Sequence, residues 1–261
     1  MTREKRKRRL ARAAVSLGAA ALLTVAVAGE SWASTPTIKW SSGAPSPVSQ
    51  LTLPMSFESA PDASGIYFAY YTTMESGTRP YAGFQPKPVD SDGNPNLQAV
   101  FSSFNANATT TDSNCTLGAD GGAGVSCAVR FAYTKGTMYA IVLQRVSDNG
   151  TTELLSGDVV DTTTDTTVAH IGSFSLPSSA GLFKVSDSGF IEPYLTAGCS
   201  QRVTVTYGTP TAAQDGVTYT GTLPTVTDPS SGSCLSTTST ETGAGRQVTV
   251  TGNSYVSDSS S

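Results

Sequence analysis

The sequence lacks several features that enzymes and nucleic-acid-binding proteins commonly use. Charged residues make up only 14% of the 261 residues, against about 25% in a typical soluble domain, and only one residue is a histidine. That residue, His170, lies in a strand-like run, and no Gly-x-Ser-x-Gly segment occurs in the chain. A Ser-His-Asp hydrolase is therefore not expected, and His170 is interpreted as a solvent-facing strand residue.

Long hydrophobic runs are missing after the N-terminus. The chain begins with a basic run, a short apolar run and the small-x-small site Ser31-Trp32-Ala33, which together predict a secretory signal peptide over residues 1–33. The apolar run is short for a membrane span, which needs about 20 residues. An uncleaved N-terminal anchor is the alternative. We expect a secreted, extracellular protein with no membrane partner once the signal peptide is removed.

Positive charge is scarce in the predicted mature chain. Residues 1–33 hold seven of the 16 basic residues and two of the 20 acidic ones, so nine basic and 18 acidic residues remain and the net charge is near −9. Such a surface repels phosphate backbones, so nucleic acid and anionic membranes are poor partners. We expect a monomer that carries no cofactor.

The four cysteines all lie in the predicted mature chain. Export places them in an oxidising compartment, where an even number favours disulfides. We predict the pairs Cys115–Cys127 and Cys199–Cys234, because neighbours in the sequence close the shorter loops, and each bridge should stabilise the fold by roughly 3 to 4 kcal/mol. A zinc site is the alternative, but the CxxC spacing is absent and only His170 could help.

Helical periodicity is also missing, and the recurring pattern is that of short strands. Runs rich in Val, Ile, Thr, Tyr and Phe alternate with turn residues. The expected strands are "TIKW", "SQLTLPMSFE", "GIYFAYYT", "YAGFQ", "LQAVFSSF", "SCAVRFAYT", "TMYAIVLQRV", "TTELLSGDVVD", "TVAHIGSFSL", "GFIEPYLT", "QRVTVTYG" and "RQVTVTG". This pattern predicts an all-β fold, an antiparallel two-sheet sandwich of jelly-roll type.

The domain organisation follows from the same pattern. We expect one β-sandwich domain over residues 34–254, with a disulfide-tied C-terminal part, and a frayed tail over residues 255–261. A separate small lobe after Gly208 is the alternative. Thr134-Lys135-Gly136 and Asp148-Asn149-Gly150 each supply the glycine of a tight turn, so each is predicted to close a hairpin.

The aromatic stretch from Gly65 to Pro88 raises the question of a binding surface. Because strand residues alternate, Ile66, Phe68 and Tyr70 are expected to face the core. The other side would then carry a ligand-binding patch, with Gly83 leaving room for a ligand, and its expected members are Tyr67, Tyr71, Tyr81 and Gln85. Rings and amides suit sugars, but cross-strand aromatic pairs also stabilise a sheet without any ligand.

Several segments occur in the order found in a known family. "YAGFQPKP", "LQAVFSSFNANATTTDSNC", "GADGGAGVSCAVRF", "HIGSFSLP" and "GFIEPY" resemble, in that order, a family of secreted bacterial proteins built around a domain of unknown function, especially its actinobacterial members. The family's motifs are matched by Gly83-Phe84-Gln85, Val100-Phe101-Ser102 and Phe190-Ile191-Glu192, and Phe104 stands where the family typically has Trp. The resemblance spans roughly residues 40–208. It implies a secreted β-sandwich with no established activity.

Carboxyl groups offer the remaining route to catalysis. Glycoside hydrolysis needs two of them at a suitable separation, and Glu192 is the candidate general acid because its apolar neighbours would raise its pKa. Its candidate partners are Glu58, Asp90 and Glu153. A purely structural role for Glu192, as a hydrogen-bond acceptor at a strand end, is the alternative.

Two loops invite other functional interpretations. The segment from Asp90 to Asn94 has oxygens at alternate positions, but Pro95 and Phe101 replace the Gly and Glu of an EF-hand. A polar turn is expected there, and a different type of calcium loop stays open. The glycines of "GADGGAG" lack the Lys-Ser/Thr of a phosphate loop, and the predicted Cys115–Cys127 bridge explains them better.

Taken together, these features predict a carbohydrate-binding or cell-wall-binding module whose partner is a polysaccharide or cell-wall glycan, and no metal site is assigned. A glycan hydrolase or lyase that uses carboxylates is the second candidate, so the sequence leaves open whether the protein is an enzyme. A structural or protein-interaction module of the cell surface is the third.

Overall fold

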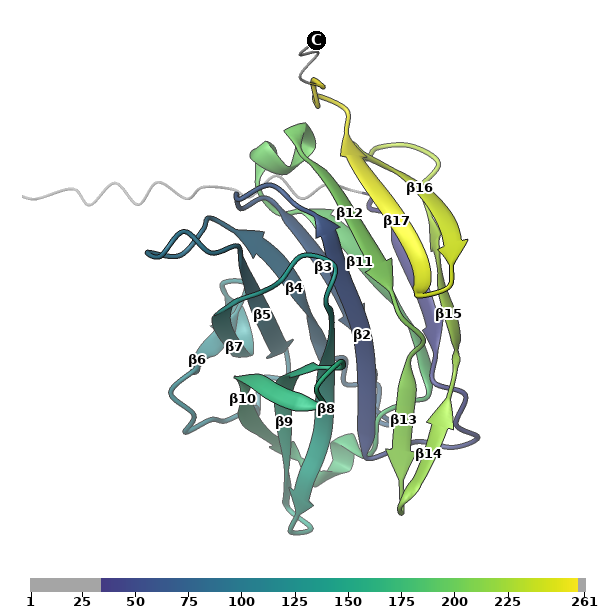
Figure 1. Cartoon of the computed structure of the whole chain (residues 1–261). Helices are drawn as coiled ribbons and strands as arrows, with labels where there is room; N and C mark the ends of the chain where they lie inside the picture. Colours follow the sequence, from purple (N-terminus) through teal and green to yellow (C-terminus); the bar gives the residue numbers. More distant parts are fainter. Residues whose placement is uncertain (1–33, 258–261) are drawn as a thin grey trace, which may run out of the picture.

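The computed structural model describes residues 34–257 and shows an all-β protein with two antiparallel sheets. The sheets lie face to face as a β-sandwich (Figure 1). The predicted signal peptide, residues 1–33, and the last residues of the predicted tail, 258–261, lie outside the described residues. Residues 255–257 follow the last strand and form no regular structure.

The first sheet has eight strands and the second has nine. In spatial order the first sheet contains β15 (Thr222–Thr227), β1 (Thr37–Ser41), β11 (Ser186–Pro193), β3 (Ile66–Tyr71), β4 (Tyr81–Lys87), β5 (Asn96–Ser103), β7 (Gly122–Ala132) and β6 (Cys115–Ala119). The second contains β10 (Thr166–Pro177), β9 (Thr152–Asp161), β8 (Met138–Asp148), β2 (Gln50–Ser59), β12 (Arg202–Tyr207), β17 (Gly245–Gly252) and β16 (Leu235–Thr242), while β13 (Thr211–Gln214) pairs with β2 and with β14 (Val217–Thr220). Two short 3₁₀ turns, Ser178–Ala180 and Thr196–Ser200, complete the described elements.

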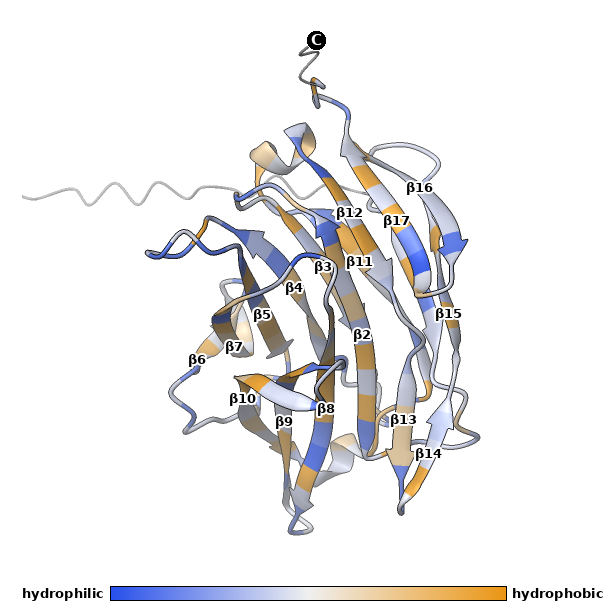
Figure 2. Cartoon of the chain, viewed as in Figure 1, coloured by the Kyte–Doolittle hydropathy of each residue, from blue (hydrophilic) through white to orange (hydrophobic). Residues whose placement is uncertain are grey.

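The core lies between the two sheets and is built by residues at alternate positions. Figure 2 shows hydrophobic residues alternating with hydrophilic ones along β12 and β17. In β3, Ile66, Phe68 and Tyr70 all point into this core, as predicted. The ring of Phe57 in β2 packs edge-on against Phe68, with 5.3 Å between ring centroids. One continuous cluster runs from Ile38 to Val250, so the C-terminal strands share the core of the others.

The connections differ from the prediction at one turn. Asp148-Asn149-Gly150 closes the predicted β8–β9 hairpin. Thr134-Lys135-Gly136 does not close a hairpin, because β7 belongs to the first sheet and β8 to the second. Gly136 has the positive φ that a tight turn needs, at 79°, so the local turn was predicted correctly and the pairing of its flanking strands was not.

Five strands were not expected from the sequence. They are β6, β13, β14, β15 and β16. The segment "GADGGAG", interpreted as a loop, forms the end of β6, a tight turn and the start of β7. This hairpin lies at the edge of the first sheet, next to β5.

Both disulfides join the cysteines that the sequence pairs, Cys115 with Cys127 and Cys199 with Cys234. Cys115 and Cys127 are opposite residues of β6 and β7. Cys199 lies in the second 3₁₀ turn, and Cys234 lies just before β16. Two disulfides indicate folding in an oxidising, extracytoplasmic environment. Residues 34–257 contain no helix long and apolar enough to cross a membrane.

Candidate functional site

The outer face of the first sheet, opposite the core, carries the chain's second apolar cluster. Tyr71 in β3 lies opposite Tyr81 in β4, and two positions along the strands Ala69 lies opposite Gly83. Tyr67 and Gln85 continue the same alternation. The structure therefore places all four predicted ligand-binding residues on one face of two neighbouring strands.

Two of the predicted residues are more buried than expected. The sequence predicted that these tyrosines form an outward ligand-binding patch, yet Tyr67 and Tyr81 are each only 5% exposed. Tyr71 and Gln85 are partly exposed. The difference arises because residues from other elements pack on this face, which strand alternation by itself cannot indicate.

Phe190 in β11 is the central ring of this face. Its centroid lies 5.0 Å from that of Tyr71, 5.7 Å from that of Tyr67 and 6.5 Å from that of Tyr81. Phe104, which follows β5, stacks on Tyr81 at 5.4 Å and is 51% exposed. We call this surface the aromatic face, and its rings are Tyr67, Tyr71, Tyr81, Phe104, Phe190 and Tyr194. The sequence did not indicate that Phe190 and Phe104 lie on this face, although Phe190 stands two residues before Glu192.

Gly83 has a structural role that differs from the predicted one. A Cβ at this position would overlap the carbonyl oxygen of Phe68 and the Cα of Ala69 in β3. The glycine therefore lets two strands approach each other closely, which is a common reason for glycine inside a strand.

The Gly-rich turn, residues 118–124, packs against the aromatic face. Three of its glycines and Asp120 have positive φ, and Gly124 approaches the backbone of Ser103 so closely that a Cβ would overlap it. The Tyr81 hydroxyl donates a hydrogen bond of 2.9 Å to Oδ2 of Asp120. The turn thereby adds a carboxylate that the sequence analysis did not assign to this site.

Glu192 lies on the aromatic face, directly opposite Tyr67 in the pairing of β11 with β3. It is half-buried, and burial, followed by the charge of Asp120, raises its pKa. Burial likewise raises the pKa of the Tyr67 hydroxyl, with further contributions from Tyr81, Asp120 and Glu192. The Tyr67 hydroxyl is buried and has no hydrogen-bond partner among residues 34–257.

Two cations at the margins of the aromatic face already have partners. Lys87 Nζ donates to the Tyr194 hydroxyl at 2.9 Å. The Arg79 guanidinium lies 3.6 Å from the Tyr71 centroid and forms an ion pair of 2.8 Å with Asp187. No basic side chain of the described part of the chain lies within 4.0 Å of the carboxylates of Asp120 or Glu192.

The expected carboxylate partners of Glu192 lie elsewhere. Glu58 in β2 accepts hydrogen bonds from Ser56 and Thr206 within the second sheet. Glu153 in β9 points into that sheet's buried side, is fully buried, and has its pKa raised by burial to about 7. Asp90 accepts backbone hydrogen bonds within its own turn. Asp120 is the carboxylate whose charge, after burial, raises the pKa of Glu192.

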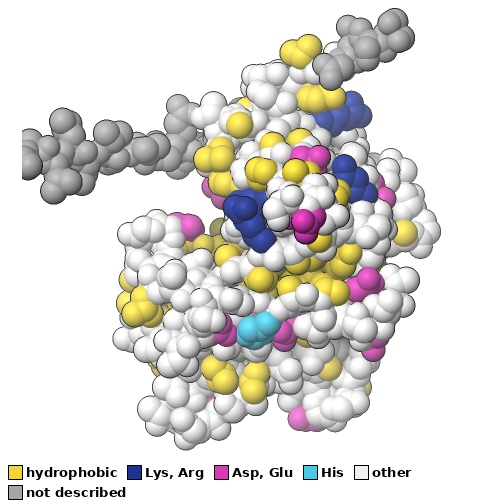
Figure 3. All heavy atoms as spheres, turned by 60° about the vertical axis from the view of Figure 1, so that its left-hand side comes forward, with side chains coloured by type: hydrophobic (Ala, Val, Ile, Leu, Met, Phe, Trp, Pro, Cys, Tyr) yellow, Lys and Arg dark blue, Asp and Glu magenta, His cyan; other side chains and the backbone are white. Residues whose placement is uncertain are grey.

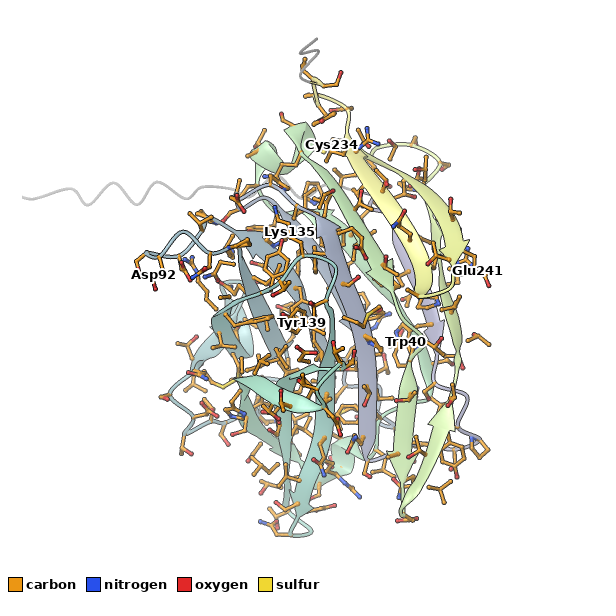
Figure 4. All side chains as sticks on the ribbon, viewed as in Figure 1. Trp40, Asp92, Lys135, Tyr139, Cys234 and Glu241 are labelled. Carbon is orange, nitrogen blue, oxygen red and sulfur yellow. A yellow bond between two sulfur atoms is a disulfide. The ribbon has the colours of Figure 1, made fainter. Side chains whose placement is uncertain are left out.

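The 88–95 turn has the predicted polar character. Asp90 Oδ1 accepts from the backbone nitrogens of Asp92 and Asn94, and Asp92 lies at the tip of the turn, away from the body of the molecule (Figure 4). Among residues 34–257, no group of three or more His, Cys, Asp or Glu side chains is placed to hold a metal ion.

His170 is partly solvent-facing, with 44% of its side chain exposed. Both of its ring nitrogens nevertheless contact a carboxylate. Its Nδ1 lies 2.7 Å from Oδ1 of Asp158 and its Nε2 lies 2.8 Å from Oδ2 of Asp112. Figure 3 shows the single histidine between acidic side chains. Within residues 34–257, the side-chain partners of the two ring nitrogens are these two carboxylates.

Two surface hollows lie away from the aromatic face. One is lined by Thr109, Thr110, Thr111, Leu154, Ser173, Phe174 and Ser175, and the other by Asn94, Pro95, Ala132, Tyr133, Thr134 and Lys135. Neither brings together rings and free carboxylates as the aromatic face does. The chain matches no protein-family model and no curated protein sequence.

Proposed function

We propose that the aromatic face binds a polysaccharide or cell-wall glycan. The observation that carries this proposal is the line of partly exposed rings, Tyr71, Phe190 and Phe104, on the outside of a rigid sheet. The C–H faces of sugar rings stack on such side chains, and each aromatic contact contributes about 0.5 to 1.5 kcal/mol beyond the area it buries. The partly exposed rings come from β3, from β11 and from the residue after β5, and such a spread suits a polymer more than a small molecule.

Polar side chains beside the rings supply the hydroxyl contacts that a sugar needs. Gln85 in β4 lies opposite Gln98 in β5, and Gln98 lies opposite Arg130 in β7. All three are at least partly exposed. Ring stacking combined with amide and guanidinium donors gives both affinity and orientation.

The same proposal includes the finer features predicted from the sequence. We infer a secreted, extracellular protein, a jelly-roll connectivity, and kinship with the secreted bacterial family that the strand motifs resemble. The disulfides and the outward aromatic face support export. The meanders β3–β4–β5 and β8–β9–β10 are antiparallel hairpin runs of the kind found in many sandwich folds.

Sedimentation with insoluble glycans tests the binding proposal. Phe190→Ala and Tyr71→Ala should each weaken binding about fivefold, which corresponds to about 1 kcal/mol of lost stacking. Tyr67→Ala is a poorer test because the ring is buried and its loss would unfold part of the sheet. Tyr219→Ala, in β14 and outside the aromatic face, is the matched control. Wild-type protein that sediments with no glycan would disprove the proposal.

Hydrolysis or elimination of the glycan is the second candidate function. The observation that favours it is Glu192, whose raised pKa suits a general acid, beside Asp120, which accepts a hydrogen bond from Tyr81. New reducing or unsaturated ends in the same binding assays would reveal turnover. If Glu192→Gln leaves such turnover intact, Glu192 is not the acid.

A further inference from the structure

The aromatic face carries two carboxylates, those of Asp120 and Glu192, that have no partner cation among residues 34–257. Asp120 reaches it from the Gly-rich turn through its bond to Tyr81, and Glu192 reaches it from β11, opposite Tyr67. No basic group among residues 34–257 lies within 4.0 Å of either carboxylate. Burial, followed by the negative charge of Asp120, raises the pKa of Glu192. A cation placed between them would relieve this repulsion.

A third acceptor on the same face points to a ligand. The Tyr67 hydroxyl is buried, has no hydrogen-bond partner among the described residues, and is close enough to both carboxylates for each to raise its pKa. A buried hydroxyl left unpaired costs about 1 to 3 kcal/mol. A bound donor would remove that cost.

The three acceptors sit among aromatic rings. Tyr67 and Tyr81 pack edge to face, with 6.2 Å between centroids, and Phe190 contacts both. The faces of such rings attract cations. The protein already uses this attraction at the margins of the same surface, where Arg79 lies on Tyr71 and Lys87 lies near Tyr194.

We propose that Asp120, Glu192 and Tyr67 bind the protonated amine of an amino sugar within the glycan. A primary ammonium has three N–H donors, and the aromatic face offers two carboxylates and one unpaired, buried hydroxyl as acceptors. An anionic sugar would meet two negative charges here. A divalent metal ion would find only two carboxylates, among rings that give it no ligands.

The overall charge of the protein favours the same ligand. The whole chain carries a net charge of −4, which raises the local concentration of cationic polymers around it. This inference rests on the proposed glycan binding at the aromatic face. It adds the charge and the chemical class of the sugar.

The test compares two ligands that differ only at the amine. Glucosamine oligomers and N-acetylglucosamine oligomers of equal length are titrated into the full mature chain at a pH where the free amine is protonated. Glucosamine oligomers should bind at least tenfold more tightly. Glu192→Gln and Asp120→Asn should each remove most of that preference while leaving the weaker binding of the acetylated oligomers.

Asp92→Asn, on the exposed 88–95 turn, is the matched control because it removes one negative charge away from the face. It should leave the preference unchanged, and a thermal unfolding scan of each variant checks its fold. Equal affinity for the two ligands would overturn this inference and leave glycan binding standing. Binding of neither ligand would overturn this inference, and failure with every glycan would also overturn the proposed function.

Discussion

At the scale of single residues, the aromatic face depends on side chains from strands far apart in the sequence. Alternation along β3 correctly separated Phe68 from Tyr67, because a period of two is a property of the strand itself. The same reasoning could not place Phe190 or Asp120 beside Tyr81. Phe190 comes from β11 and Asp120 from the Gly-rich turn, and only the pairing of strands brings them there.

His170 provides a prediction about pH at this scale. Both its ring nitrogens face carboxylates that can only accept hydrogen bonds, so both can donate only when the ring is protonated. The hydrogen bond with Asp158, followed by that with Asp112, raises the pKa of His170. A raised pKa in the folded state means that the stabilisation is complete below the ordinary histidine pKa of about 6.5. It is lost as the pH rises through the folded value.

We therefore expect the stability advantage of wild type over His170→Gln to shrink between about pH 6 and pH 8. Urea unfolding at both pH values measures it. The comparison of two chains cancels other titrating groups, including the buried Glu153. An advantage that stays constant, or that grows with pH, would contradict a protonated His170 bridge.

At the scale of elements, the strands that bury several apolar residues were predictable and the mostly exposed strands were not. β2, β8, β9 and β10 carry clear apolar alternation that a half-buried strand requires. β14 and β16 are almost fully exposed along their length and rich in Thr and Ser. Such strands form because a neighbour supplies backbone hydrogen bonds, and that neighbour is not visible in a local pattern.

The Gly-rich turn gives a prediction at the element scale. Gly124 has a φ of 112° and packs against the Ser103 backbone, so Gly124→Ala should destabilise the protein by roughly 1 to 3 kcal/mol. The substitution should also weaken the hydrogen bond from the Tyr81 hydroxyl to Asp120. Gly122→Ala, where a Cβ meets only an ordinary contact with the oxygen of Ala119, is the control. Urea midpoints that fall equally in both variants would show that the close packing at Gly124 is unimportant.

At the scale of the whole molecule, the two disulfides tie different parts of the sandwich. Cys115–Cys127 spans 12 residues within one hairpin, and Cys199–Cys234 spans 35 residues around the C-terminal strands. Because longer closed loops restrict the unfolded chain more, removing the second bridge should cost about 4 kcal/mol and removing the first about 3 kcal/mol. The free energies of unfolding of the two double Cys→Ser variants measure this order. A larger loss from the shorter loop would mean that native packing, and not loop length, sets the cost.

The sequence by itself determined the all-β class, the inward face of β3 and the cysteine pairs. These follow from residue spacing, because alternation and short loops are local properties of a chain. The tertiary structure decided that β7 and β8 belong to different sheets, that Tyr67 and Tyr81 are buried, and that Asp120 is the carboxylate near Glu192. Those facts depend on which strands pair across the sheet. The residues of one segment do not determine which of the other strands it pairs with.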